Sequence, residues 1–230
     1  MNKVEKKHIF FDLDNTVTRS RSKISEELKN FLTNIGKDII IVSGATCKQI
    51  AFQMDGVPCY KLGQNGNHAE DKDGKIIWEE LLTSEEKDEI IKHINFLPRS
   101  WEVKDEKDLV QDRGCQISYS LLGHNKILEN KENFDPKSEV RKSLLTKHPF
   151  TSKTLQVKIG GTTCLDYTAK GKHKGFYVAE LIKIMGWNKD ESIYFGDMLF
   201  PGGNDESVIG VITTIEVKNP DNTLEILKSL

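Results

Sequence analysis

A short apolar segment near the N-terminus, His8–Phe11, is followed directly by two carboxylates, Asp12 and Asp14. Such a run is typical of a buried strand in a parallel sheet. Residues two apart on extended backbone face the same side, so both carboxylates can reach one ligand beyond the carboxyl end of the strand. Open α/β sheets bind their ligands at that edge. The segment therefore predicts an α/β fold with a polar site at the end of its first strand.

Two later segments repeat the pattern of a buried strand that ends in a polar residue. Ile39–Val42 leads into Ser43, and Ser192–Gly196 leads into Asp197. Lys174 stands at the start of a helical pattern. We predict that these segments form one phosphoryl-transfer site, in which Ser43 donates a hydrogen bond to phosphoryl oxygens and Lys174 neutralises their charge.

The first two carboxylates suit a divided task, in which Asp12 attacks phosphorus while Asp14 gives and takes the proton. Two such charges repel each other unless a cation lies between them, and a phosphate adds more negative charge. Hard oxygen ligands without a Cys or His cluster indicate Mg²⁺ rather than Zn²⁺. We expect Asp12, Asp197 and the backbone carbonyl of Asp14 to hold this ion, while Asp205 either binds it directly or supports its ligands.

These segments, in this order, resemble the haloacid dehalogenase superfamily of phosphotransferases. The interval between Gly44 and Lys174 is long enough for an α/β cap of the type IIB kind. The resemblance implies an α/β fold with a Rossmann-like parallel-sheet core, residues 1–81 and 169–230, and an inserted α/β cap domain, residues 82–168.

Within that superfamily the chain is most similar to eukaryotic-type phosphomannomutases. The similarity lies in three blocks, Arg113–His124, Gly160–Asp166 and Gly196–Asp205, of which the last, with its Pro-Gly-Gly-Asn-Asp sequence, is the most specific. Six residues are expected to bind substrate on this basis: Thr16, Gly44, Arg113, His124, Asp166 and Asn204. The resemblance implies that the substrate is a sugar phosphate.

Departures from the mutase pattern change the expected reaction. His124 stands where these mutases carry a cap arginine for the distal phosphate, Cys164 replaces a serine, and Met198-Leu199 replace Lys-Thr. Ser43 replaces a glycine and matches the phosphatases of the superfamily. A mutase must hold a bisphosphate by both ends, so the loss of a bidentate cation weakens that interpretation. Two interpretations of His124 stay open: as a partly charged group near neutral pH it contacts phosphate or a sugar hydroxyl, or it is a plain residue of a cap loop.

We therefore expect a sugar-phosphate phosphatase that uses a phospho-aspartate intermediate. The alternative is a phosphomannomutase or phosphohexomutase that interconverts hexose 1- and 6-phosphates. A catalytically silent sugar-phosphate-binding module is less favoured, because Asp12 and Asp14 are both present. A P-loop nucleotide enzyme is excluded, since the chain has no G-x-x-x-x-G-K-[ST] sequence.

The amino-acid composition limits the kinds of binding partner that the protein can have. A formal net charge of −2 argues against electrostatic binding to nucleic acid or a membrane. We expect the partner to be a small-molecule sugar phosphate and the protein to be a monomer or homodimer. No apolar run approaches the roughly 20 residues of a membrane span, and no secretory signal is seen, so we expect a cytoplasmic protein.

The cysteines are far apart and are predicted to be free thiols: Cys47, Cys59, Cys115 and Cys164. The histidines other than His124 lack metal-ligand spacing and are predicted to be surface or hydrogen-bonded structural residues: His8, His68, His93, His148 and His173.

The periodicity of apolar residues predicts the remaining elements. Helices are expected at 24–35, 46–54, 83–97, 135–147 and 174–185, and from 221 onward. Further strands are expected at 58–62 and 211–215, with a hairpin turn at Asp73-Gly74. Alternation at 115–121 and 155–159 predicts cap strands with one polar face.

Overall fold

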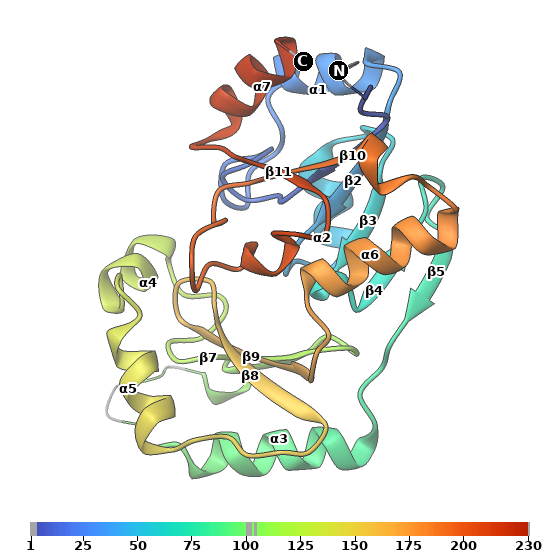
Figure 1. Cartoon of the computed structure of the whole chain (residues 1–230). Coiled ribbons are helices and arrows are strands. Elements are labelled where there is room, and N and C mark those ends of the chain that lie inside the picture. The colour runs from blue at the N-terminus through green and yellow to red at the C-terminus, as the bar shows by residue number, and fades with distance from the viewer. Residues whose placement is uncertain (1–3, 100–102, 104, 230) are drawn as a thin grey trace. The chain divides into compact units, whose positions relative to one another are not determined.

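The computed structural model describes residues 4–99, 103 and 105–229. The chain divides into two compact units (Figure 1). The discontinuous unit comprises Met1–Glu79 and Lys172–Leu230, and the inserted unit comprises Glu80–Gly171.

A seven-stranded sheet forms the centre of the discontinuous unit, in the order β11-β10-β1-β2-β3-β4-β5. Its strands are β1 (His8–Phe11), β2 (Asp38–Val42), β3 (Tyr60–Gly63), β4 (His68–Glu70), β5 (Ile76–Glu79), β10 (Ser192–Gly196) and β11 (Thr213–Glu216). The strands from β11 to β3 pair in parallel, whereas β4 and β5 add an antiparallel edge. The predicted α/β fold with a parallel sheet is confirmed.

Helices cover both faces of this sheet. They are α1 (Glu26–Asn34), α2 (Cys47–Met54), α6 (Lys174–Met185) and α7 (Pro220–Lys228). One apolar cluster joins Ile9 and Phe11 of β1 to α1, α2 and α7, and a second joins Phe10 to α6. Alternate residues of β1 therefore face two different helical layers, which explains why the whole strand is apolar.

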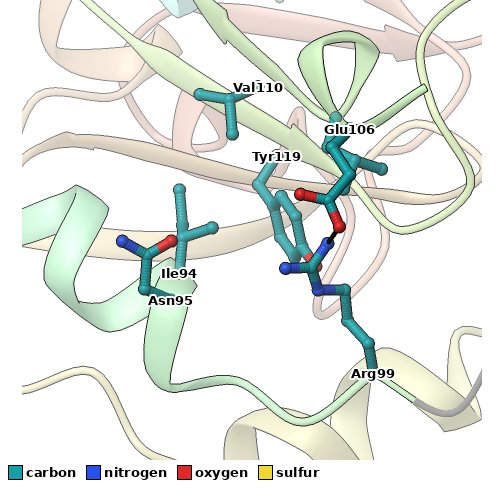
Figure 2. A pocket seen from close by; sticks show the side chains of 7 residues that line it. Ile94, Asn95, Arg99, Glu106, Val110 and Tyr119 are labelled. Carbon is teal, nitrogen blue, oxygen red and sulfur yellow. Dashed lines mark hydrogen bonds and ion pairs between the residues drawn. The ribbon is translucent and has the colours of Figure 1, made fainter. Parts of the chain in front are cut away.

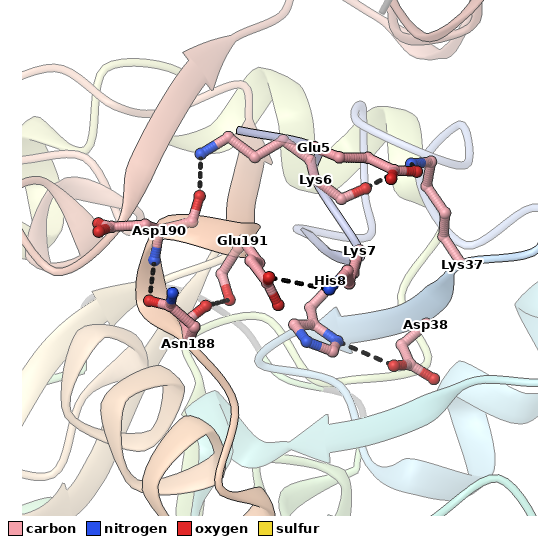
Figure 3. Close-up of polar contacts among 10 residues, drawn as sticks. Glu5, Lys6, Lys7, His8, Lys37, Asp38, Asn188, Asp190 and Glu191 are labelled. Atoms are coloured by element: carbon pink, nitrogen blue, oxygen red, sulfur yellow. Dashed lines mark hydrogen bonds and ion pairs between the residues drawn. The ribbon is translucent and has the colours of Figure 1, made fainter. Parts of the chain in front are cut away.

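Polar contacts fix the amino ends of the central strands, at the opposite edge from Asp12 (Figure 3). The Lys7 ammonium lies 2.8 Å from Glu191, just before β10, and His8 Nδ1 lies 2.8 Å from the Asp38 carboxylate of β2. The imidazole of His8 also stacks on Trp187, with ring centroids 4.0 Å apart. These contacts join β1 to both of its neighbours.

The inserted unit is a four-stranded antiparallel sheet with helices packed on it. Its sheet has the order β6-β7-β9-β8, with β6 (Val110–Asp112), β7 (Ile117–Ser120), β8 (Leu155–Gly160) and β9 (Cys164–Ala169). Its helices are α3 (Ser84–Phe96), α4 (Leu128–Phe134) and α5 (Glu139–Lys147). Ile90 and Ile94 of α3 pack in one apolar cluster with Tyr119 of β7 and Leu165 of β9.

Several predicted elements need correction in this unit. The helix expected from Asp135 begins at Glu139, because the Asp135 carboxylate accepts hydrogen bonds from the Val140 and Arg141 amides and Ser138 takes a positive φ of 58°. Helix α4 and strands β6 and β9 were not predicted. Strand β7 has no exposed polar face, since Ser118 and Ser120 are buried and hydrogen-bond to Asp166 and Thr163.

The four cysteines are all free thiols, as predicted. Within the residues that the structure describes, no helix combines the length and the apolar composition that a membrane span requires.

Candidate active site

Asp12 lies at the carboxyl edge of the sheet, directly after β1. Its backbone N–H donates to the Phe195 carbonyl of β10 at 2.9 Å, which extends the parallel pairing of the two strands by one residue. Asp197 follows β10 at the same edge. The side chain of Asp12 is 4% exposed, so the carboxylate is held in a largely dry environment.

Lys174 joins the two carboxylates Asp12 and Asp205. It is the first residue of α6, and its buried ammonium donates to Asp12 Oδ1 at 2.5 Å and to Asp205 Oδ1 at 2.7 Å. The imidazole of His173 caps this helix by accepting from the Phe176 N–H. The Tyr194 hydroxyl donates to the same Asp205 oxygen at 2.5 Å. Sequence reasoning missed Tyr194 because it lies inside an apolar strand.

Burial and like charges dominate the electrostatics of this cluster. Burial, together with the Asp205 and Asp197 carboxylates, raises the pKa of Asp12 to about 7 against the opposing effect of Lys174. Burial and Asp205 also raise the pKa of Asp197. Burial alone lowers the pKa of Lys174, but the Asp12 and Asp205 carboxylates outweigh it, so the net shift is upward. The lysine is therefore charged, and this one cation lies beside a group of three carboxyl side chains.

A divalent cation fits these carboxylates. Asp12, Asp197 and Asp205 each offer an oxygen, and the three oxygens lie within 4.8 Å of one another. A set of hard oxygen ligands suits Mg²⁺. The Asp14 carboxylate does not join this group: its Oδ1 accepts from the Arg21 backbone N–H at 3.0 Å.

The loop after Asp12 is a tight turn. Asn15 takes a positive φ of 62°, and the Leu13 carbonyl accepts from the Thr16, Val17 and Thr18 amides. The Thr16 carbonyl accepts from the Thr223 hydroxyl at 2.7 Å, which anchors the turn to α7. Among the described atoms, the buried Thr16 hydroxyl has no hydrogen-bond partner. A buried hydroxyl without a partner is costly, so this group is an unmet hydrogen-bonding site next to Asp12 and Asp14 in the sequence.

Ser43 and Gly44 follow β2, the strand beside β1. The Ser43 side-chain oxygen accepts from the Ala45 N–H at 3.1 Å, and its backbone N–H donates to the Leu62 carbonyl at 3.0 Å. A side chain at Gly44 would make ordinary contact with Asn65. The structure therefore holds Ser43 in a defined turn at the same edge of the sheet as Asp12.

Asp205 is placed by the compact loop that follows β10. The Asp205 N–H donates to the Met198 carbonyl at 3.2 Å, and a Cβ on Gly203 would collide with that carbonyl. A Cβ on Gly196 would likewise meet the Asp205 carboxylate. Glycine is required at both positions because backbone and carboxylate approach so closely. Asn204, between Gly203 and Asp205, is exposed.

The inserted unit brings together the predicted cap residues. Ser118 of β7 donates to Asp166 Oδ1 at 2.6 Å, and its carbonyl accepts from His124 Nε2 at 3.1 Å. Arg113 donates to the Gln111 side chain at 3.0 Å, and its charge lowers the pKa values of both Asp166 and His124. Sequence reasoning missed Ser118, whose alternating position in a strand gave no sign of this role.

Two titrating groups of this set respond to burial in opposite ways. Burial raises the pKa of Asp166, although the Ser118 hydroxyl and Arg113 oppose the shift. Burial lowers the pKa of His124, and Arg113 and Lys131 lower it further. The imidazole is therefore largely neutral near pH 7, contrary to the expectation of partial charge, and suits a sugar hydroxyl better than a phosphate.

Two cavities of the inserted unit lie apart from these residues. One, of about 90 Å³, is lined by Ile94, Tyr119 and the Arg99–Glu106 ion pair at 3.2 Å (Figure 2). The other, of about 500 Å³, lies between Pro98 and the residues of α5. Neither lining includes a residue predicted to act on substrate.

Comparison with known families identifies the chain. A family model described as haloacid dehalogenase-like hydrolase matches residues 9–209. The chain belongs to the haloacid dehalogenase-like hydrolase family. The family predicted from the sequence, and with it the prediction of an enzyme, is confirmed.

Curated relatives within the haloacid dehalogenase-like hydrolases are phosphomannomutases. Phosphomannomutase 1 of Dictyostelium discoideum is 28% identical over 241 residues, which cover 96% of this chain and 94% of that protein. A phosphomannomutase of Solanum lycopersicum is 26% identical over 233 residues, which cover 94% of this chain and 90% of that protein. The similarity to phosphomannomutases that the sequence blocks indicated is therefore confirmed.

Solved structures support the haloacid dehalogenase fold. A phosphatase of the haloalkanoate dehalogenase superfamily from Bacteroides thetaiotaomicron superimposes with a TM-score of 0.69 at 14% identity and covers 99% of this chain and 96% of that one. A structure from Thermotoga maritima gives a TM-score of 0.67 at 16% identity, with 98% of this chain and 97% of that one covered. At such identity these structures support the fold alone.

Proposed function

We propose that the chain is a Mg²⁺-dependent sugar-phosphate phosphatase that works through a phospho-aspartate on Asp12. One observation carries the proposal: the buried Lys174 ammonium lies between Asp12 and Asp205, 2.5 and 2.7 Å from their oxygens. A lysine fixed in this way orients the Asp12 carboxylate and provides positive charge where phosphoryl oxygens would gather.

The chain's own residues account for each bond change. An Asp12 oxygen attacks phosphorus, the bond between phosphorus and the sugar oxygen breaks, and Asp14 gives that oxygen its proton. Asp14 then takes a proton from water, whose oxygen attacks phosphorus and breaks the bond to Asp12. Inorganic phosphate leaves and both aspartates return to their starting states. Ser43 donates a hydrogen bond to a phosphoryl oxygen during both displacements.

The metal site would be formed by Asp12, Asp197 and the backbone carbonyl of Asp14, with Asp205 adjoining it. When bound, Mg²⁺ would offset the negative charge of the carboxylates and the phosphoryl oxygens. Tyr194 and Lys174 both donate to Asp205 Oδ1, so the proposal assigns Asp205 the task of holding Lys174 in place.

Substrate recognition is assigned to Thr16, Gly44 and Asn204 in one unit and to Arg113, His124 and Asp166 in the other. The Thr16 hydroxyl, which has no hydrogen-bond partner among the described atoms, and the link between Asp166 and His124 through Ser118 support these roles. As part of the same proposal, Glu80–Gly171 serves as the cap, and the chain acts in the cytoplasm as a monomer or homodimer on a small molecule.

A hexose phosphomutase is the second candidate, favoured by the curated relatives named phosphomannomutase. The neutral, buried imidazole of His124 argues against it, because a mutase must grip a distal phosphate with a strong cation. Hydrolysis requires that only one phosphate be held.

The test is a panel of hexose, pentose and polyol phosphates, assayed with Mg²⁺ for both inorganic phosphate and isomer formation. We expect phosphate to be the main product from hexose 1- or 6-phosphates, and addition of a hexose 1,6-bisphosphate to leave isomer formation slow. Rapid interconversion of the two isomers after bisphosphate priming, with little phosphate released, would establish the mutase instead. If folded protein forms neither product with any substrate of the panel, the chain is a sugar-phosphate-binding module and not an enzyme of this kind.

A further inference from the structure

A second group of metal-ligand side chains lies in the discontinuous unit, apart from the Asp12 cluster. Cys47, His68 and Glu70 each offer one ligand atom, and these atoms lie within 4.8 Å of one another. The sheet order places β4, which carries His68 and Glu70, three strands away from β1. None of these residues takes part in the proposed phosphoryl transfer.

The fold brings the three side chains together from two distant segments. His68 and Glu70 are two residues apart on β4 and so point to the same face of the sheet. Cys47 is the first residue of α2, directly after the Thr46 N-cap. Gly63 of β3 pairs with His68, and a Cβ there would lie 3.0 Å from the Cys47 sulfur. The missing side chain leaves the space in which the thiol approaches β4.

The imidazole of His68 is oriented as metal-binding histidines are. Its Nε2 is buried without a hydrogen bond among the described atoms and lies 3.5 Å from Glu70 Oε1, whereas its Nδ1 lies 3.6 Å from Glu79 Oε1 of β5. A ligating histidine usually directs one nitrogen at the ion and the other at a carboxylate. The sequence-based expectation that His68 is a surface or hydrogen-bonded structural residue does not explain why Nε2, among the described atoms, faces the Glu70 carboxylate without a hydrogen bond.

We propose that Cys47, His68 and Glu70 bind a Zn²⁺ ion, with Glu79 orienting the imidazole and water as the fourth ligand. Sulfur, nitrogen and oxygen ligands together suit zinc, whereas the all-oxygen Asp12 cluster suits Mg²⁺. The Cys47 thiol donates to the carbonyls of Lys61 at 3.6 Å and His68 at 3.5 Å, so metal binding replaces these two contacts and releases the thiol proton to solvent. The position of Cys47 at a helix N-terminus favours the thiolate.

The surrounding charges match this ion. Lys61 is buried, and its ammonium lies 3.4 Å from Glu70 Oε2, the oxygen that does not face His68. With the thiolate and the carboxylates of Glu70 and Glu79, the ion and Lys61 form an electrically balanced cluster. Binding would tie the start of α2 to β4 and thereby hold the turn that presents Ser43.

Cobalt provides the test, because a thiolate bound to Co²⁺ gives an intense charge-transfer absorption that oxygen ligands do not give. The full chain, reduced and freed of metal, is titrated with Co²⁺. We expect one equivalent to produce the band and one equivalent of Zn²⁺ to abolish it. Asp12→Asn should keep the band, since the carboxylate cluster contains no sulfur.

Substitutions of two buried cysteines show which sulfur binds the metal ion. Cys47→Ser should lose the band, whereas Cys59→Ser, which alters another buried thiol of the same unit, should keep it. Glu79→Gln should weaken Zn²⁺ binding by about tenfold, as is usual for a carboxylate that orients a ligating histidine. If Cys47→Ser does not fold, His68→Gln is used, and at least a tenfold loss of Zn²⁺ affinity is expected. Absence of the band in the wild-type chain, or its survival in folded Cys47→Ser, overturns the proposal.

Discussion

Lys174 shows how a single residue can set the charge of a whole site. Its ammonium is 1% exposed and compensates two carboxylates. A buried cation of this kind is tolerated only while its partners remain, because an unpaired charge in the interior is costly. The consequence for variants is asymmetric: neutralising Asp12 leaves Lys174 with Asp205, whereas removing Lys174 leaves two carboxylates without their cation.

The first prediction concerns Asp12. Asp12→Asn should remove turnover, because an amide cannot form the acyl phosphate. The fold should survive, since burial and the neighbouring carboxylates already raise the pKa of Asp12 to about 7 and so disfavour its charged form. Phosphate release and thermal unfolding are measured together, with exposed Asp73→Asn as the control. Substantial activity in a pure, folded variant would assign the nucleophile to another residue.

Arg113 carries the second prediction. If it recognises the part of the sugar phosphate away from the scissile bond, Arg113→Ala should reduce kcat/KM for a preferred sugar phosphate at least tenfold more than for a small generic phosphate ester. Arg99→Ala, which removes another arginine of the inserted unit from its ion pair with Glu106, should change neither value. Equal losses on both substrates would mean that Arg113 supports the structure or the chemical step.

Among the helices and strands, the sequence predicted the ends correctly where neighbouring residues in the chain determine them. The helices expected at 46–54 and 83–97 are present as α2 and α3, each capped by a threonine, and the strands that lead to Asp12 and Asp197 are present as predicted. The prediction failed at α5, where side-chain contacts of the preceding loop decide the start of the helix. The carboxylate of Asp135 binds the Arg141 guanidinium at 2.8 Å as well as two amides, and this moves the helix start to Glu139.

In the candidate site, too, the sequence predicted some residues and missed others. A strand followed by a carboxylate is visible in sequence, so Asp12 and Asp197 could be placed at one edge of the sheet. Contacts such as Tyr194 to Asp205 and Ser118 to Asp166 could not be, because they depend on strand register and loop packing. The Cys47, His68 and Glu70 group was also invisible, since its members have no ligand spacing along the chain.

The third prediction tests the cap of α3. The Thr83 hydroxyl accepts from the Glu86 N–H, and the Glu86 carboxylate accepts from the Thr83 N–H. Thr83→Ala should lower the free energy of unfolding by about 1 kcal/mol, and Thr83→Ser should restore most of it. Denaturant unfolding supplies the measurement. An unchanged midpoint for Thr83→Ala would show that packing of Ile90 and Ile94, rather than the cap, determines where α3 begins.

Acid stability is a property of the whole molecule, and one carboxylate between three segments contributes to it. Asp55 ends α2 and lies 2.6 Å from the ammonium of Lys23 and 2.7 Å from that of Lys29 in α1. Hydrogen bonds from Lys23 and Lys29 lower the pKa of Asp55 to about 2. A carboxyl whose pKa is lower in the folded chain stabilises the fold above its ordinary pKa of about 3.9 and loses that effect as the pH falls through the folded value.

The fourth prediction follows from the lowered pKa of Asp55. Asp55→Asn should melt at a lower temperature than the wild type near pH 7, and the difference should shrink between about pH 4 and pH 2. Asparagine tolerates the left-handed backbone of this position, where φ is 48°, so the comparison isolates the charge. Melting curves across that range, with Asp73→Asn alongside, give the result. A difference that does not depend on pH would show that the ion pairs do not stabilise the fold.

The pairing of β1 with β10 joins residues on either side of the whole inserted unit, with His8 opposite Ser192. This has a consequence during biosynthesis. The inserted unit is one continuous stretch, so it can fold on the ribosome while β10 has not yet been translated. Until then β1 has one open edge, which is prone to pair with other chains. Asp12 is thus made before the inserted unit and is enclosed only after that unit has been translated.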